Sequence, residues 1–319
     1  MASYGYKLMC EEHGPEALLR NACRAEELGF DFVAISDHYH PWSGKQGHSP
    51  HAWTVLGAIA SRTQRAGLVT AVTCPMVRYD PAIVAQFAAT LGILSGGRFT
   101  LGVGAGENLN EHVVGAGWPP PRARREMLCE AIDVMRLLWE GGEVSFEGAH
   151  LAVDRAKLWD LPARPPAVAV AAGGPKMAQM AGQKGLGLFS TEPSRELLRA
   201  WKDAGGKGPS YVEVALCWAR QESEAVRVAH ERFAFSLLGW KLNAELPTTS
   251  SLEAAASHVR PDEVREQIPC GPDPDRHVAA VRKALDAGFD HPILVGVGPD
   301  QEGFLRFWQQ ELAPRLRRL

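Results

Sequence analysis

Eight short apolar runs recur along the chain, and each is followed by a segment with helical periodicity. An apolar run of about four to eight residues bounded by Gly, Pro or polar clusters is typical of a buried strand, whereas apolar residues three and four apart indicate a helix. The predicted strands lie at residues 6–10, 32–36, 66–74, 98–103, 167–172, 187–190, 211–218 and 292–297. Strands that alternate with helices predict a parallel sheet, and eight such units predict a (β/α)8 TIM barrel.

The last third of the chain departs from this alternation. Residues 222–238 predict one long helix. Residues from about 239 to 271 show no strand pattern, and we interpret them as an insertion. A length of 319 residues is compatible with one barrel, so we expect a single domain over residues 1–319.

Composition argues against several function classes. The net charge of −3 does not suit a general nucleic-acid or membrane-surface role. The chain has no run of ~18 apolar residues, and its first residues lack the apolar core of a signal peptide. The six cysteines are dispersed without a Cys-x-x-Cys pair, which fits reduced thiols. We therefore expect a soluble cytoplasmic protein.

The second predicted strand ends in a cluster of reactive side chains. Asp37, His38, His40 and Trp42 follow it closely. In a TIM barrel, function is located at the carboxyl ends of the strands. A carboxylate, two imidazoles and an indole at one strand end suit proton transfer beside a flat ligand.

A metal site is the main alternative for this cluster. His-x-His is a spacing found among metal ligands. A barrel metallohydrolase would need further His or Asp ligands at later strand ends, but the fifth and sixth predicted strands end in Ala-Ala-Gly-Gly and Ser-Thr-Glu-Pro. A purely structural His in a loop is the other alternative.

Glycines mark the ends of two further strands. After the fourth, Gly-Val-Gly-Ala-Gly-Glu at 102–107 lets the backbone approach a flat ligand and places Glu107 in the barrel mouth. After the fifth, Gly173 and Gly174 precede a helix start and Lys176. Free backbone N–H groups and the helix dipole favour a phosphate there. An ordinary tight turn is the alternative in both places.

These segments together resemble one enzyme family. The sequence is similar to coenzyme F420-dependent oxidoreductases of the luciferase-like group, and most similar to the branch of F420-dependent glucose-6-phosphate dehydrogenases. The matching segments lie at 36–42, 78–81, 102–110, 171–175 and 312–319. The resemblance implies a barrel with an insertion, a homodimer, and a deazaflavin in the mouth with its phosphate and glutamate tail leading outward.

The resemblance also implies roles for individual residues. His38 would be the acid or base on the substrate hydroxyl, Glu107 would serve the proton balance at the cofactor ring, and Trp42 would form a wall beside the substrate. The residues implied to bind the cofactor are Asp37, Cys74, Ala105, Gly106, Asn110, Gly173, Gly174 and Lys176. The bond between Ala71 and Val72 falls where the group has a non-proline cis peptide.

The sequence departs from the sugar-phosphate enzymes where they hold the substrate phosphate. They use a Thr and a Lys after the sixth strand, a Lys in the insertion and an Arg beyond it. Here Thr191 matches, but Ser194 stands at the Lys position, and these two residues are the candidate substrate contacts. The Arg position falls near Gln267, and Lys241 is the candidate for the inserted Lys. Because charge-assisted hydrogen bonds carry phosphate recognition, the departure predicts weak binding of glucose 6-phosphate.

We therefore expect an F420-dependent dehydrogenase with a small-molecule substrate and no metal, nucleic-acid or membrane partner. A hydride would pass between an alcohol carbon, of a sugar or sugar phosphate among other candidates, and carbon 5 of the deazaflavin, while His38 takes the hydroxyl proton. Three alternatives remain. They are reduction of a carbonyl or imine by reduced F420, an FMN-dependent monooxygenase of the same superfamily, and a metal-dependent hydrolase.

Overall fold

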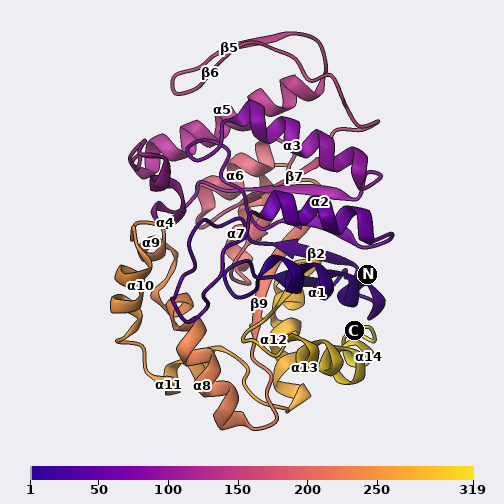
Figure 1. The fold of residues 1–319 in the computed structure, drawn as a ribbon, viewed down its shortest axis with the longest axis vertical. Helices are drawn as coiled ribbons and strands as arrows, with labels where there is room; N and C mark the ends of the chain where they lie inside the picture. Colours follow the sequence, from indigo (N-terminus) through magenta and orange to yellow (C-terminus); the bar gives the residue numbers. More distant parts are fainter. Residues whose placement is uncertain (1) are drawn as a thin grey trace.

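A closed barrel of eight parallel strands forms the centre of the computed structural model, which describes residues 2–319 (Figure 1). Around the barrel the strands follow the order β1-β10-β9-β8-β7-β4-β3-β2. They are β1 (Gly5–Leu8), β2 (Phe32–Ile35), β3 (Gly67–Thr70), β4 (Phe99–Val103), β7 (Ala167–Ala171), β8 (Gly187–Ser190), β9 (Ser210–Leu216) and β10 (His291–Gly296). The predicted TIM barrel is confirmed.

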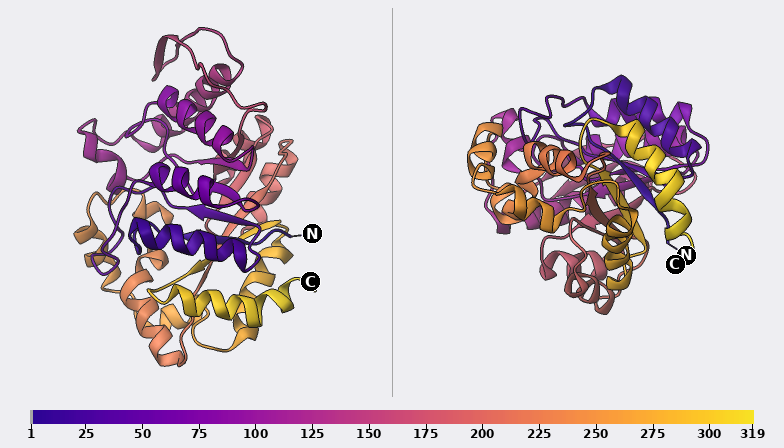
Figure 2. Two further views of the ribbon diagram at one scale, coloured as in Figure 1. Left: turned by 45° about the vertical axis from the view of Figure 1, so that its right-hand side comes forward. Right: turned by 90° about the horizontal axis from the view of Figure 1, so that it is seen from below.

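Helices cover the outside of the barrel, and the two chain ends lie side by side in all views (Figures 1 and 2). The surrounding helices are α1 (Pro15–Glu27), α2 (Ala52–Arg62), α3 (Pro81–Leu94), α5 (Pro121–Trp139), α6 (Pro175–Gln183), α7 (Arg195–Asp203), α8 (Glu222–Phe233), α12 (Pro274–Ala287) and α13 (Gln301–Phe307). The last continues through a π turn, Trp308–Leu312, into α14 (Ala313–Leu316). Several helices begin with Pro, whose fixed backbone angle and missing N–H suit the first helical position.

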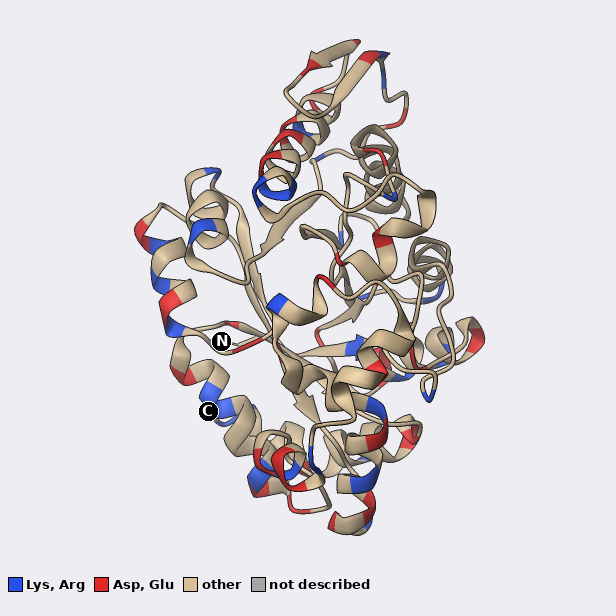
Figure 3. Cartoon of the chain, turned by 90° about the vertical axis from the view of Figure 1, so that its left-hand side faces the viewer, with Lys and Arg blue, Asp and Glu red and all other residues tan. Residues whose placement is uncertain are grey.

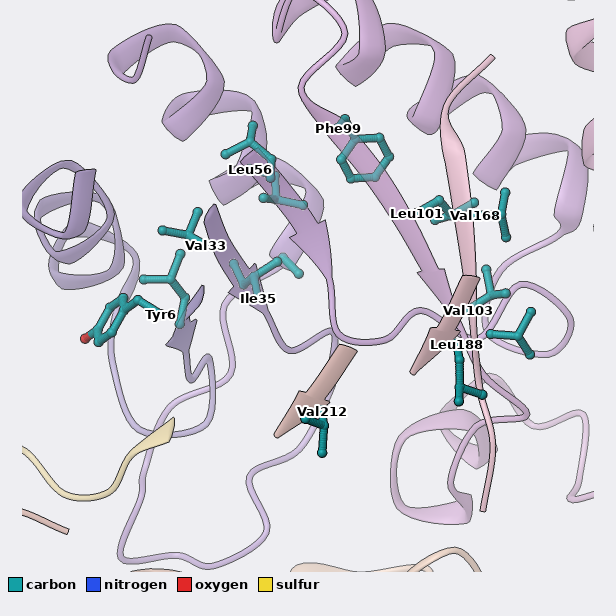
Figure 4. Packing of buried hydrophobic residues seen from close by; sticks show 14 of the residues in the cluster. Tyr6, Val33, Ile35, Leu56, Phe99, Leu101, Val103, Val168, Leu188 and Val212 are labelled. Atoms are coloured by element: carbon teal, nitrogen blue, oxygen red, sulfur yellow. The ribbon is translucent and has the colours of Figure 1, made fainter. Parts of the chain in front are cut away.

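Most strand residues are apolar on both faces because each strand separates two apolar layers; Lys7 of β1 and Glu213 of β9 are exceptions. In β2, Phe32 and Ala34 belong to the cluster inside the barrel, whereas Val33 and Ile35 pack against the helices (Figure 4). Alternate residues of a strand point to opposite faces. A strand buried on both faces therefore reads as a continuous apolar run, which is the pattern that predicted the barrel.

The insertion folds as three short helices: α9 (Trp240–Asn243), α10 (Thr249–Ala256) and α11 (Pro261–Gln267). The helix predicted over 222–238 ends earlier, at Phe233, and continues as a 3-10 segment over Ala234–Leu238. In Figure 1, α9 and α10 lie beside α4 (Asn108–Glu111). The backbone N–H of Asn108 donates to the carbonyl of Ala244 at 3.0 Å, so the insertion is attached at the strand-end face of the barrel.

Two local predictions were wrong. An antiparallel hairpin of β5 (Val144–Glu147) and β6 (Ala152–Ala156) follows α5 where no strand was predicted. The third strand, predicted over 66–74, ends at Thr70. Beyond it the Ala71–Val72 peptide bond is cis, at the position that the resemblance implies, and pairing resumes in a bridge between Thr73 and Val103.

Figure 3 views the side of the molecule on which α4, α9 and α10 lie in Figure 1. Lys and Arg are mixed with Asp and Glu around its edge, without a large area of one charge. Within residues 2–319, no helix has both the length and the hydropathy that a membrane span requires.

Candidate active site

His38 lies at the centre of a buried charge cluster formed by the ends of three strands. Glu11 follows β1, His38 follows β2 and Glu107 follows β4. His38 Nδ1 lies 2.6 Å from Glu11 Oε1, and His38 Nε2 lies 3.4 Å from Glu107 Oε2. The structure thus brings together His38 and Glu107, the two residues predicted from the sequence to take part in proton transfer. It adds a second carboxylate, that of Glu11.

The two carboxylates change the protonation of the imidazole. Burial alone would lower the pKa of His38, but the charges of Glu11 and Glu107 outweigh burial and raise this pKa to about 9. Burial alone would raise the pKa of Glu11, but the charges of His38 and Lys7 lower it to about 2. At neutral pH the pair is therefore an imidazolium beside a carboxylate, which is stable in a buried place only while both partners are present.

Glu11 was not singled out by the sequence analysis. Ser36 Oγ donates to Glu11 Oε2 at 2.6 Å and accepts the backbone N–H of Cys10 at 3.0 Å. The hydrogen bond from Ser36 fixes the Glu11 carboxylate beside Nδ1 of His38. Its position directly after the first predicted strand was the available signal, because all strand ends of a parallel barrel meet at one face.

A second buried ion pair lies in the barrel near this cluster. Lys7 Nζ is 2.5 Å from Glu213 Oε1 and donates to the carbonyl of Ala71 at 2.9 Å. Lys7 therefore holds the carbonyl of the cis peptide bond, and its charge helps to keep Glu11 ionised.

Asn110, an expected cofactor contact, is buried and connects two segments of the site. Its Oδ1 accepts the backbone N–H groups of Tyr39 at 2.8 Å and His40 at 3.1 Å. Its Nδ2 donates to Glu107 Oε2 at 2.8 Å. Asn110 thereby fixes the loop after His38 relative to Glu107.

Asp37, another expected cofactor contact, has no exposed side-chain surface. Its carboxylate accepts from Thr73 Oγ1 at 2.7 Å, Arg78 Nη2 at 3.0 Å and Trp53 Nε1 at 3.2 Å. The backbone N–H of Arg78 in turn donates to Glu111 Oε2 at 2.9 Å. In this arrangement the Asp37 carboxylate organises the protein around Arg78, and its contact with the cofactor stays a prediction.

Gly106 covers two buried groups. Its φ is +75°, and a Cβ there would lie 2.7 Å from Cys74 Sγ and 2.9 Å from Glu111 Cγ. Burial raises the pKa of the Cys74 thiol, and it also raises the pKa of Glu111, to about 7, against the charge of Arg78. Cys74 therefore lies beneath the backbone at 105–106, where Ala105 is half-buried.

Trp42 forms a wall shared with the segment that leads into the insertion. Its ring meets His38 edge-on, with centroids 5.0 Å apart, and stacks on Phe235 at 4.9 Å and 11°. Thr249 Oγ1 of α10 donates to the carbonyl of Pro41 at 2.8 Å. The insertion thus helps to hold Trp42 against His38.

Gly173 and Gly174 follow β7, the neighbour of β4 in the barrel. A Cβ on Gly173 would lie 2.8 Å from Trp240 Cδ1, whereas a Cβ on Gly174 would meet no atom within 4 Å. Gly174 precedes α6 without a side-chain cap, and Lys176 is exposed on the first turn. Pro175 has no N–H, and the N–H groups of Met177 and Ala178 donate to the carbonyl of Gly174. A backbone anion site here would therefore depend on the N–H groups of Gly174 and Lys176.

Thr191 and Ser194, the expected substrate contacts, follow β8. Thr191 is exposed. Ser194 caps α7, since its Oγ accepts the backbone N–H of Leu197 at 3.3 Å. The Ser194 hydroxyl thus has a structural partner already, and its role toward a substrate stays a prediction.

The metal alternative gains no support from this geometry. Within residues 2–319, no group of three or more His, Cys, Asp or Glu side chains is arranged to hold a metal ion. His40, which supplied the His-x-His spacing, instead stacks on His112 with ring centroids 6.2 Å apart.

A protein-family model described as luciferase-like monooxygenase matches residues 5–291. The chain belongs to the luciferase-like family. Two F420-dependent glucose-6-phosphate dehydrogenases resemble this luciferase-like chain over the full length of both proteins. The protein from Amycolatopsis mediterranei (strain U-32) is 36% identical over 334 aligned positions, and that from Intrasporangium calvum is 37% identical over 335. The family resemblance drawn from the sequence motifs is therefore confirmed.

A solved structure resembles the luciferase-like chain closely as well. It is an F420-dependent secondary alcohol dehydrogenase in complex with an F420–acetone adduct. Its TM-score is 0.91 and its sequence identity 30%, with 99% of each chain covered. The F420-dependent tetrahydromethanopterin reductase of Methanopyrus kandleri, at 22% identity and a TM-score of 0.77, shares the fold.

Proposed function

We propose that this luciferase-like chain is an F420-dependent oxidoreductase that passes a hydride between a substrate alcohol carbon and carbon 5 of the deazaflavin. The observation that carries the proposal is His38 held between Glu11 and Glu107 at the barrel mouth. A positioned imidazole and carboxylate suit the proton transfer that accompanies hydride transfer. The F420-dependent dehydrogenases that resemble the chain support the choice of cofactor.

The barrel mouth fits a flat ring. Val72 and Ala171 are half-buried apolar side chains that pack on the cluster inside the barrel. Gly104 lies between them, and a Cβ there would be 2.7 Å from Val72 Cγ2 and 3.5 Å from Ala171 Cβ. The absence of a side chain at Gly104 leaves a low apolar floor beside the charge cluster, which suits a planar deazaflavin.

The N-terminus of α6 would hold the cofactor phosphate. A Cβ on Gly174 would meet no atom within 4 Å, so an anion has room to approach the backbone there, and Lys176 adds a positive charge on the first turn of α6. F420, when bound, supplies the carbon that accepts or donates the hydride; the protein supplies placement and proton transfer.

His38 moves the substrate proton. Because Nδ1 faces Glu11, the hydroxyl proton is taken up at Nε2, the nitrogen beside Glu107. Glu11 fixes the orientation of the ring and stabilises its charged form, while Asn110 holds Glu107 in place. Trp42 lies edge-on to the imidazole and excludes water from that side.

Reduction of a carbonyl by reduced F420 is a second candidate, favoured by the pKa of about 9 at His38. Near neutral pH the imidazolium is ready to give a proton, whereas alcohol oxidation needs the neutral ring. The same residues serve both directions, and the ratio of the two rates should change with pH.

A neutral alcohol fits the charges better than a sugar phosphate. Two cations near the charge cluster are already paired, Lys7 with Glu213 and Arg78 with Asp37. A phosphate dianion would need exposed Lys241 of α9 to approach it. Turnover with 2-propanol, glucose and glucose 6-phosphate tests this. We expect the highest kcat/KM for a neutral alcohol. If the enzyme instead saturates with glucose 6-phosphate, and Lys241→Ala loses this saturation, the expected preference for a neutral alcohol is wrong.

Titration of the purified protein with F420 and with FMN tests the cofactor. We expect tight binding of F420 and weak binding of FMN. His38→Asn and Glu107→Gln should bind F420 but lose turnover, by roughly the 10²- to 10⁴-fold that positioned acid–base groups contribute. Tighter binding of FMN, or full turnover in both variants, would be incompatible with the proposal.

We also propose that the chain forms a homodimer through α3. This helix has no charged residue, and it exposes Ile83, Ile93 and Leu94 by 45%, 46% and 59%. Exposed apolar faces of this kind are typical of interfaces, and a second copy of the chain is the commonest partner. Ile93→Glu should shift the mass measured by light scattering from dimer to monomer, whereas Val114→Glu, at an exposed site away from α3, should leave it unchanged.

A cytoplasmic location remains part of the proposal. It is supported by the six cysteines, all of which are free thiols in the structure. Fractionation of the producing cells tests it.

A further inference from the structure

Two of the six free cysteines are paired with each other where the insertion returns to the barrel. Cys217 directly follows β9, and Cys270 follows α11, the last helix of the insertion. They form an isolated parallel bridge: the N–H of Cys217 donates to the carbonyl of Pro269, and the N–H of Gly271 to the carbonyl of Cys217, both at 2.9 Å.

The pairing places the two thiols side by side in an apolar cluster. Directly paired residues of neighbouring strands have backbones about 4.8 Å apart. That separation falls within the range of about 4.4–6.8 Å between the Cα atoms of a disulfide. Both side chains are buried in the same cluster, which also contains Val264 and Ile268 of the insertion.

The environments of the two thiols differ. The neighbouring Cys217 thiol lowers the pKa of Cys270 against burial, and the nearby charge of Arg276 adds to this effect. The neighbouring Cys270 thiol is the larger cause and burial the second cause of a raised pKa at Cys217. The Cys217 thiol itself donates to the carbonyl of Ala225 at 3.2 Å. Cys270 is therefore the thiol that ionises first, and the thiolate is the reactive form.

We propose that Cys217 and Cys270 are a redox modification site that closes reversibly into a disulfide by exchange with a low-molecular-weight disulfide, which reaches the two buried thiols when the bridge between the end of β9 and the end of the insertion opens locally. The Cys270 thiolate attacks one sulfur of the small disulfide, which forms a mixed disulfide and releases one small thiolate. Cys217 then loses its proton, and its thiolate attacks the Cys270 sulfur and expels the second small thiolate. The protein loses two electrons and two protons, and the small disulfide becomes two thiols.

The bond would join the end of β9 to the end of the insertion. It would close a loop that contains α8, the insertion and Phe235, which stacks on Trp42. Closing a loop this long restricts the unfolded chain and stabilises the folded one. The site is independent of the proposed hydride transfer, and its test needs no F420.

The test uses the full chain, reduced and then equilibrated with oxidised glutathione. After alkylation of the remaining thiols, peptide mass mapping should find the peptides of Cys217 and Cys270 joined, with the loss of two hydrogen atoms. The apparent Tm should rise by several degrees on oxidation and fall back after reduction. The shift should be absent in Cys217→Ala and Cys270→Ala but present in Cys10→Ala, which removes a buried thiol outside the pair.

Three outcomes would overturn the proposal. They are continued alkylation of both cysteines after oxidation, glutathione adducts without the internal link, or a Tm shift that persists in Cys217→Ala. Far-UV circular dichroism of each reduced variant establishes that it is folded. Should one alanine variant fail to fold, Cys270→Ser keeps a polar side chain of similar size and gives the same readout.

Discussion

His38 Nδ1 and Glu11 Oε1 are 2.6 Å apart at the ends of the neighbouring strands β1 and β2. Because one ring nitrogen faces Glu11, the other faces Glu107 at 3.4 Å. The orientation and the charge of the imidazole are thus set by a carboxylate that would touch neither substrate nor cofactor. Glu11 is a positioning residue, and its removal should change how activity depends on pH.

Glu11→Gln should shift the pH profile of alcohol oxidation. In the wild type, kcat/KM should rise with pH through about 9, because oxidation needs the neutral form of His38. Without the charge of Glu11, the pKa of His38 falls and the midpoint moves to lower pH. Glu12→Gln is the matched control, since the neighbouring Glu12 is buried but pairs with Arg232 at 2.6 Å. An unchanged midpoint in Glu11→Gln would refute the positioning role.

His38 should also make folding stability depend on pH. Its pKa is raised from 6.5 to about 9 in the folded protein, so folding favours the protonated ring. This stabilisation is complete below the unfolded pKa of 6.5 and is lost as pH rises through about 9. It is at most about 3 kcal/mol, from 1.36 kcal/mol per pKa unit. Urea unfolding across this window should show a smaller decline in His38→Asn than in the wild type or in His258→Asn, an exposed control.

The barrel was predictable because its strands are buried on both faces, which leaves uninterrupted apolar runs in the sequence. The β5–β6 hairpin was not, because its strands are partly exposed and carry no such run. Its loop is held from a distance: the carboxylate of Glu130 on α5 accepts the N–H groups of Ala149, His150 and Leu151. A contact between a helix and a later turn has no local signature.

The site was predictable in part for a similar reason. His38 and Glu107 could be placed together because parallel strands end at one face of a barrel. Glu11 could not be told from a solvated turn residue, since its function comes from its contact with His38. Asp37 has the residue type expected at a ligand, but its carboxylate is taken up by donors from later segments, among them Thr73 and Arg78.

Asn110→Ala should lower activity with a smaller effect on F420 binding. The substitution removes the acceptor for two backbone N–H groups of the His38 loop and the donor to Glu107. Misplacement of a catalytic group by about 1 Å costs on the order of 10²-fold, so kcat should fall by about 10- to 100-fold. Asn108→Ala is the control, because the side chain of Asn108 donates to the carbonyl of Glu245. Equal losses in both variants would mean that the effect is a general loosening of this loop.

Gly106→Ala should destabilise the protein more than Gly115→Ala, although the two glycines have the same φ of +75°. Each substitution places an L side chain in the left-handed region, at a cost of about 1–2 kcal/mol. At Gly115 a Cβ would meet no atom within 4 Å, whereas at Gly106 it would lie 2.7 Å from Cys74 Sγ. Overpacking of this kind adds roughly 1–3 kcal/mol, so the free energies of unfolding in urea should differ by that amount. Because relief of the clash would lift the backbone at 105–106 into the barrel mouth, Gly106→Ala should also weaken F420 binding, and Gly115→Ala should not. Equal stability and equal F420 affinity in the two variants would show that the backbone at Gly106 has room to move without disturbing the site.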